Sequence, residues 1–250
     1  MTIPGVLAGA SVGNRWSPEQ DAALRMFVPG GSSVPASGSD VRGTDDPANT
    51  PAGISPDDVR PMIPLGQFRD TFILAVDDEG VAIIDQHVAH ERVLFEQISE
   101  TLRAGRLPSQ RLLTPMIIDL SPAQRQAVAA HRDTLERFGI EVEEFGGDSL
   151  RLAALPALLQ PADCEATVRA LAEDLEGLDR GSRAEEALGR IAATMACHAA
   201  VKANYPLTLT QMRYILEELR RTAYSSVCPH GRPVVLRLSR REIEKNFHRI

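Results

Sequence analysis

One stretch around residue 85 constrains the fold of this chain more than any other. Two runs of alternating apolar residues, Phe72–Val76 and residues 81–84, are separated by Asp-Asp-Glu-Gly, which is typical of a β-hairpin. The second run ends at Asp85, and the residues from 86 to 103 then have a helical pattern. We therefore expect a hairpin whose second strand leads directly into a helix.

The junction of this strand and helix carries three candidate metal ligands. His87 and Glu91 stand four residues apart, so both side chains lie on one face of the helix, and Asp85 immediately precedes it. Imidazole and carboxylate together suit zinc, manganese or iron better than calcium. The alternative is structural: Asp85 caps the helix, His87 is a polar surface residue, and Arg92 pairs with Glu96.

Cysteine and histidine recur together at two later places. Cys197 and His198 lie in an apolar-periodic helix, whereas Cys228 and His230 lie in a turn with two prolines and a glycine. Proline and glycine fix the backbone there, so the Cys and His of the turn can face one ion. As the alternative, Cys197 is a small buried hydrophobic residue, as most lone cysteines are. Cys164 has no polar group of this kind around it and is expected to be a bystander.

These residues carry a resemblance to the MutL family of DNA mismatch repair proteins. Residues 85–96 resemble the family's endonuclease motif Asp-Gln-His-Ala-x-x-Glu-x-x-x-x-Glu, and residues 228–233 match its Cys-Pro-His-Gly-Arg-Pro motif. Residues 196–198 are similar to its Ala-Cys-Arg motif, and residues 247–249 match its Phe-x-Arg motif. The match covers roughly residues 62–250. It is to the nuclease-active branch, because MutL proteins of bacteria that use Dam methylation lack these motifs.

Two positions depart from the family's motifs. Val88 stands where the family has Ala, which is expected to alter only packing. His198 stands where the family has Arg or Lys, so a permanent charge is replaced by a group mostly neutral at pH 7. If that position contacts DNA phosphate or orients the site, weaker activity is expected.

The resemblance implies a metal-dependent endonuclease that nicks one strand of duplex DNA, with Asp85 and Glu91 as catalytic residues. It implies one metal cluster with these ligands: Asp85, His87, Glu91, Cys197, Cys228 and His230. Zinc is implied as a structural or regulatory ion, to which thiolates are suited, and manganese or magnesium as the ion that supports cleavage. Arg232 is expected to hold phosphate. Four further residues are expected to support the ligands: Gln86, Glu96, His198 and Arg249.

A short segment resembles the Gln-x-hydrophobic-hydrophobic-x-Pro motif with which MutL proteins bind the bacterial sliding clamp. Gln110 offers a donor and an acceptor, Leu112 and Leu113 can fill an apolar pocket, and Pro115 favours an extended backbone before it. The alternative is an ordinary edge strand. The resemblance also implies a homodimer, double-stranded DNA and a MutS-like mismatch sensor as partners.

The distribution of charge bears on the DNA prediction more than its sum does. The formal net charge of −7 argues mildly against a nucleic-acid partner. Basic residues nevertheless gather in residues 220–249, around the Cys228 turn, where a phosphate backbone would have to lie for a metal there to cut it. The alternative is a solvated helix face.

Composition points to a cytoplasmic protein rather than a secreted or membrane protein, and the resemblance to MutL implies a bacterial protein associated with the nucleoid. Three cysteines, two of them in ligand-like contexts, indicate a reducing compartment. No secretory signal is visible, and no apolar run approaches the roughly 18 residues that span a membrane.

The expected fold is mixed α/β (α+β), with two subdomains as in the MutL C-terminal domain. Residues 1–61 are rich in Gly, Ser, Pro and Asp and are expected to form a disordered linker. Because the metal motifs must meet in space, residues 120–186 are expected to be an inserted subdomain. The resemblance implies that the insertion is regulatory and that residues 62–119 and 187–250 form the dimerisation and endonuclease subdomain. No Gly-rich nucleotide site is visible, so the family's ATP site is expected only in an N-terminal domain that this chain lacks.

Periodicity and turn residues predict the remaining elements. Ser121 is expected to cap a helix that runs to about residue 138, followed by a hairpin within residues 140–155. Later elements are expected as helices over residues 164–178, 183–203 and 210–222, a strand over 234–238, and a short helix capped by Ser239.

Two other functions fit parts of the sequence. The chain can be a non-catalytic dimerisation and docking module in which zinc only joins the two subdomains. An iron or manganese oxidoreductase built on the His-x-x-x-Glu spacing fits the two thiolates and the Arg-rich C-terminus poorly. Nicking of supercoiled plasmid with added manganese separates the nuclease from the docking module.

Overall fold

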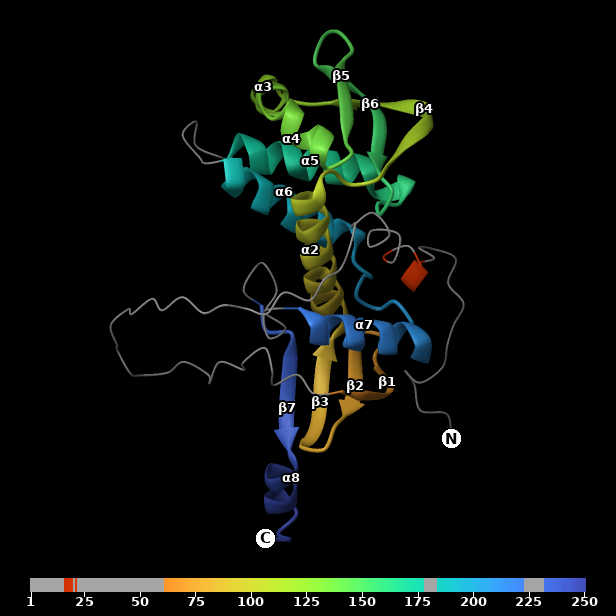
Figure 1. Cartoon of the computed structure of the whole chain (residues 1–250), viewed down its shortest axis with the longest axis vertical. Helices are drawn as coiled ribbons and strands as arrows, with labels where there is room; N and C mark the ends of the chain where they lie inside the picture. The colour runs from red at the N-terminus through yellow and green to blue at the C-terminus, as the bar shows by residue number, and fades with distance from the viewer. Residues whose placement is uncertain (1–15, 20, 22–60, 178–183, 223–231) are drawn as a thin grey trace, which may run out of the picture.

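A computed structural model describes residues 16–19, 21, 61–177, 184–222 and 232–250. Within these ranges the chain forms two lobes, and the long helix α2 (Gln86–Ala104) runs from one lobe into the other (Figure 1). Each lobe combines an antiparallel sheet with helices, so the predicted mixed α/β class is confirmed. None of the helices described is long and apolar enough to cross a membrane.

The first lobe is a sheet with strand order β1-β2-β3-β7, covered on one face by α2 and α7. Its elements are β1 (Ile63–Phe68), β2 (Phe72–Val76), β3 (Gly80–Asp85), α7 (Leu209–Arg221), β7 (Val235–Ser239) and the short helix α8 (Arg240–Asn246). The β2–β3 hairpin is confirmed, with Ile73 paired to Ile84 and both side chains in the core. Strand β1 was not predicted, because Pro64 and Gly66 interrupt its apolar alternation at a β-bulge.

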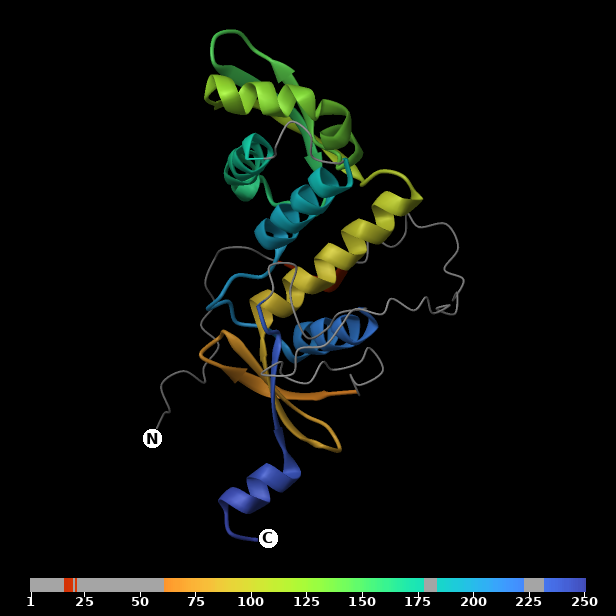
Figure 2. The same cartoon turned by 90° about the vertical axis from the view of Figure 1, so that its left-hand side faces the viewer.

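The second lobe packs helices against a sheet with strand order β4-β6-β5 (Figures 1 and 2). Its elements are β4 (Ser109–Asp119), α3 (Pro122–Ala130), α4 (Arg132–Arg137), β5 (Glu141–Glu144), β6 (Ser149–Pro156), the 3-10 turn η2 (Pro161–Asp163), α5 (Cys164–Glu176) and α6 (Ala184–Ala199). Phe138, Leu152 and Ile191 are fully buried in its core. The predicted hairpin is present as β5 and β6.

The two lobes divide the chain at positions that differ from the expected boundaries. Strand β4, expected in the first subdomain, pairs with β6, and Ile191 and Met195 of α6 lie in the core of the second lobe. Helix α2 contributes Val93 to the first core and Leu94 to the second. One amphipathic helix therefore serves both cores, and its sequence pattern does not reveal where one lobe ends.

Two predicted helices are shorter in the structure. The helix capped by Ser121 divides at His131, which separates α3 from α4. The helix expected over residues 183–203 ends at Ala199. It ends there because the Val201 amide donates to His90 Nδ1 (3.0 Å), and Lys202 Nζ binds the carbonyl oxygens of Cys197 and His198.

Part of the segment expected as linker packs against the first lobe. Trp16 is 5% exposed and Asp21 is 3% exposed, and Trp16 belongs to the core that α2 and α7 share. The short red segment beside α2 in Figure 1 shows this position. The composition of residues 1–61 as a whole concealed this contact, because their Gly, Ser, Pro and Asp content is typical of a linker.

Candidate metal centre

The start of α2 and the end of α6 bring three metal-ligating side chains together. Ligand atoms of His87, Glu91 and Cys197 all lie within 4.8 Å of one another. His87 and Glu91 share a face of α2, and Cys197 comes from the last turn of α6, with its Sγ 4.0 Å from His87 Nε2. The structure therefore joins two of the sequence motifs that are far apart in the chain.

The His87 ring is oriented by the backbone that follows α6. Its Nδ1 lies 2.9 Å from the carbonyl oxygen of Val201, which can only accept, so Nδ1 carries the proton and donates it. The lone pair is then on Nε2, which points toward Cys197. Histidines that bind metal usually donate their other ring N–H to a carbonyl or carboxylate in this way.

The donor set fits a divalent cation of the zinc type. A nitrogen and a sulfur on one tetrahedral zinc ion lie about 3.6 Å apart, so the observed 4.0 Å requires only a small side-chain adjustment. Glu91 is fully buried and Cys197 is half-buried. Both residues offer donor atoms that bind a cation as anions, and a divalent ion between them would balance both charges.

Asp85 has a structural role at this junction. Its Oδ1 accepts hydrogen bonds from the amides of His87 (3.0 Å) and Val88 (3.1 Å), which caps α2, as the alternative interpretation expects. Within the described ranges, Asp85 does not belong to the three-residue ligand group. Its role as a ligand remains a prediction. Val88, the departure from the family motif, is buried in the first core.

Two predicted ligands, Cys228 and His230, lie outside the described residues. The chain is described again from Arg232, whose side chain is exposed. Two residues later, Val234 accepts a hydrogen bond from the Asp85 amide (3.1 Å). The chain that follows the predicted ligands therefore enters the structure beside the start of α2.

Arg249 does not lie near the ligand group, contrary to the prediction. Strand β7 pairs antiparallel with β3, so Ile84 faces Val235 beside the group, whereas Gly80 faces Ser239 at the opposite end of the sheet. Helix α8 and Arg249 continue from that opposite end (Figures 1 and 2). The direction of one strand, which sequence does not give, accounts for the difference.

Gln86 joins three segments around the start of α2. It is fully buried, and its Nε2 lies within hydrogen-bonding distance of the carbonyl oxygens of Asp70 (2.7 Å), Tyr205 (2.9 Å) and Lys202 (3.1 Å). Its Oε1 accepts from Gln67, which in turn accepts from the Leu207 amide. Gln86 thus supports the site by fixing the chain that follows α6.

Glu96 and His198, both among the described residues, lie outside the three-residue ligand group. Glu96 forms an ion pair with Arg92 on the same helix, which is the alternative that the sequence left open. Burial lowers the pKa of His198, and the charge of Lys202 lowers it further, while Asp163 and Asp174 act in the opposite direction. His198 is therefore neutral at pH 7 and does not replace the family's positive charge.

Sequence analysis overlooked a buried polar contact next to the ligands. His90 is fully buried, and its Nε2 lies 2.7 Å from Asp21 Oδ2, while Asp21 Oδ1 accepts from Trp16 Nε1 (3.0 Å). The Trp16 ring also contacts His90, with centroids 4.4 Å apart. The available signal was the position of His90, three residues after His87 on the same helix face.

The predicted clamp-binding segment leaves the sheet at a bulge in β4. The pairing with β6 shifts between Arg111 and Met116, so residues 112–115 have no register partner in β6. Leu113 is fully exposed, whereas Leu112 is partly buried against the second core. Gln110 is exposed, and its Nε2 lies 3.4 Å from the Leu159 carbonyl.

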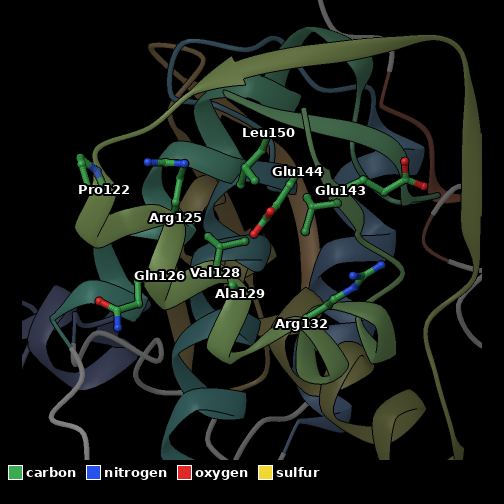
Figure 3. Close-up of a pocket in the computed structure, with 10 residues that line it drawn as sticks. Pro122, Arg125, Gln126, Val128, Ala129, Arg132, Glu143, Glu144 and Leu150 are labelled. Atoms are coloured by element: carbon green, nitrogen blue, oxygen red, sulfur yellow. The ribbon is translucent and has the colours of Figure 1, made fainter. Parts of the chain in front are cut away.

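A pocket of about 600 Å³ lies in the second lobe between α3 and the strands β5 and β6 (Figure 3). Arginines and glutamates line it together with apolar side chains, and Arg125, Glu144 and Leu150 are among them. Its lining contains no predicted site residue, and it lies at the far end of the molecule from the start of α2 (Figures 1 and 2). It therefore belongs to a part of the molecule separate from the metal ligands.

Comparison with known proteins matches this chain to one family. The MutL C terminal dimerisation domain matches residues 65–207. DNA mismatch repair protein MutL of Koribacter versatilis is 46% identical over 187 residues, which are 75% of this chain and 29% of that protein. The MutL of Acidobacterium capsulatum is 48% identical over 190 residues, 75% of this chain and 28% of that protein. The MutL of Phenylobacterium zucineum is 34% identical over 247 residues, 99% of this chain and 37% of that protein. The chain therefore spans well under half the length of these relatives.

Proposed function

The chain belongs to the MutL family of DNA mismatch repair proteins, through its C-terminal dimerisation domain, and we propose that it nicks duplex DNA at a divalent metal centre. The observation that carries the proposal is the convergence of His87, Glu91 and Cys197 within 4.8 Å. One imidazole, one carboxylate and one thiolate on two separate helices form a donor set that zinc binds well. This convergence favours a metal centre over an accidental arrangement of polar residues.

Each residue has a distinct role in the proposed centre. His87 binds the ion through Nε2, and Glu91 and Cys197 supply anionic donors. A divalent cation bound there supplies Lewis-acid chemistry, which offsets the charge that develops on the phosphoryl oxygens. Cys228 and His230 complete the ligand set in this proposal, with zinc as the resident ion and manganese or magnesium supporting cleavage. Arg232 holds a DNA phosphate.

Nicking of supercoiled plasmid in manganese tests the nuclease proposal. Asp85→Asn and Glu91→Gln are each expected to abolish nicking. Asparagine is as good a helix cap as aspartate, so Asp85→Asn removes a carboxylate while keeping the cap. Glu100→Gln, on an exposed position of the same helix, is the matched control and should nick at the wild-type rate.

The outcome also separates the nuclease from the non-catalytic docking module. A chain that binds zinc and is stabilised by it, but leaves the plasmid intact in manganese, is the docking module. If Asp85→Asn nicks at the wild-type rate, Asp85 is only a helix cap. If Glu91→Gln does so, the ligand group is not the catalytic centre.

The outer face of the first sheet is the surface that we propose for homodimerisation. Large apolar side chains alternate outward on the edge strands β1 and β7, where Ile63, Leu65, Leu236 and Leu238 are all exposed. The opposite face of the same sheet is buried under α2 and α7. A sheet that is apolar on both faces needs a second partner, and a second copy of this domain supplies one.

The bulge in β4 favours binding of the sliding clamp as a second function. Leu113 is fully exposed and residues 112–115 lie outside the β4–β6 ladder, so a peptide-binding groove can reach them. Leu112, by contrast, is partly buried and must move if it is to fill a pocket on the clamp. The contact would tether the nuclease to DNA and raise its local concentration.

Duplex DNA in the nucleoid and a MutS-like mismatch sensor are the other proposed partners.

Clamp-stimulated nicking tests this second function. Replacing Gln110 and Leu113 by Ala should leave manganese-dependent nicking unchanged and remove its stimulation by loaded clamp. Leu209→Ala, at another exposed apolar position, is the control. Stimulation that survives the double substitution would identify the segment as an ordinary edge strand.

A further inference from the structure

The backbone of Val201 is held on both sides by histidines of α2. His87 Nδ1 donates to its carbonyl oxygen (2.9 Å), and its amide donates to His90 Nδ1 (3.0 Å). His87 and His90 stand one helical turn apart, so α2 holds this one residue at two points. The position of Val201 therefore determines the direction in which His87 Nε2 points.

Asp21 fixes the proton on the second histidine. Because His90 Nδ1 accepts the Val201 amide, Nδ1 carries no proton and Nε2 must carry it. That N–H donates to Asp21 Oδ2 at 2.7 Å. Both nitrogens of His90 are thus satisfied, and Asp21 selects the one neutral tautomer that can hold Val201.

The segment that carries Asp21 is anchored by Trp16. Trp16 lies in the core between α2 and α7, close to the rings of His90 and Tyr214. Its indole N–H donates to Asp21 Oδ1, and Gln211 of α7 donates to its backbone carbonyl (2.9 Å). A buried carboxylate is costly unless it is hydrogen-bonded, so Asp21 is stable here only while this segment is docked.

We infer that Asp21 is a positioning residue of the metal centre, and that the Trp16 segment couples a distant part of the chain to His87. The path runs from Asp21 to His90, then to Val201 and to His87. The inference rests on the proposed metal site. Groups that orient a ligand histidine, as Val201 does here, typically change metal affinity by ten- to a hundredfold when removed, and Asp21 acts two residues further out, which favours the low end of this range. Its loss should therefore weaken metal binding by roughly tenfold.

Cobalt titration of the full 250-residue chain tests this inference. Co²⁺ takes the same ligands as zinc and absorbs light when a thiolate binds it, so it reports both affinity and Cys197 coordination. Asp21→Asn keeps the size of the side chain but can no longer accept from both Trp16 and His90. Glu19→Gln is the matched control, because Glu19 is an exposed carboxylate of the same segment.

Trp16 is the chain's single tryptophan and reports docking independently of metal. In Asp21→Asn we expect cobalt affinity about tenfold weaker and Trp16 emission shifted to the red, with both unchanged in Glu19→Gln. If Asp21→Asn does not fold, Trp16→Phe, which keeps an aromatic ring but removes the indole donor, should weaken cobalt binding in the same direction.

Each result has a distinct meaning. Wild-type cobalt affinity in Asp21→Asn, with Trp16 undocked, overturns the positioning role. A wild-type chain that binds cobalt with thiolate absorption but never nicks plasmid refutes the nuclease and leaves the positioning result valid. A wild-type chain without thiolate absorption refutes the metal centre, and the positioning role with it.

Discussion

Replacing Gln86 by Ala is expected to destabilise the first lobe well beyond an ordinary helix substitution. The Nε2 group has two protons and three carbonyl oxygens within reach, so it donates at most two hydrogen bonds at a time, and Oε1 accepts a third from Gln67. Each such bond contributes about 1 kcal/mol net. The predicted loss is therefore roughly 2–4 kcal/mol, a large part of the 5–15 kcal/mol typical of a domain.

The effect should extend to metal binding, because Gln86 holds the chain that follows Val201. Its contacts to Lys202 and Tyr205 fix the segment whose carbonyl orients His87. Gln86→Ala should therefore weaken cobalt binding as well as lower the free energy of unfolding. Denaturant titration, followed by circular dichroism, measures the free energy of unfolding, and cobalt absorbance measures the metal affinity.

Gln126→Ala is the matched control for this prediction. Gln126 is exposed on α3, so its loss should change the free energy of unfolding by less than about 0.5 kcal/mol. A Gln86→Ala variant as stable as Gln126→Ala would show that the buried amide contributes nothing net. A destabilised variant with wild-type cobalt affinity would show that the segment after α6 is positioned by other contacts.

Three further predictions follow from individual side chains. Burial, with the charge of Asp163 adding to it, raises the pKa of Cys164 to about 11. Iodoacetamide at pH 8 should therefore label Cys197 and leave Cys164 intact, and zinc should protect Cys197 from labelling. Peptide mass spectrometry measures the labelling of both cysteines. Burial acts to raise the pKa of Asp77, but hydrogen bonds from Arg237 and two backbone amides outweigh it and lower the pKa. The ionised Asp77 carboxylate should therefore stabilise the folded state fully above the unfolded pKa of about 3.9, and this contribution should be lost as the pH falls through the lower folded pKa. Asp77→Asn should remove this pH dependence of the free energy of unfolding in acid titrations. Leu236→Glu places a charge on the outer sheet face and should convert a dimer to monomer in sedimentation, without loss of the helical signal; a persistent dimer would locate the interface elsewhere.

Sequence alone determined most of the local elements and the residue types of the candidate site. The alternation of residues 72–84 specified the β2–β3 hairpin, and the spacing of His87 and Glu91 placed both side chains on one face of α2. The helix N-caps could also be predicted from sequence, because Ser121 and Ser239 each precede a helix and are followed three residues later by Gln124 and Glu242. These features depend on contacts within a few residues, where residue type and period are sufficient.

Only the tertiary structure decided which distant residues meet. Tertiary packing places Cys197 next to His87, 110 residues away in the chain. Helix α6 ends earlier than predicted, because the side chains of His87 and His90 bind the backbone of Val201. Arg249 lies away from the ligand group, because β7 runs antiparallel to β3 and ends at the opposite end of the sheet. Trp16, in a segment expected to be a linker, became part of the core. Each of these results comes from packing and strand direction, which depend on the whole chain, so no local pattern encodes them.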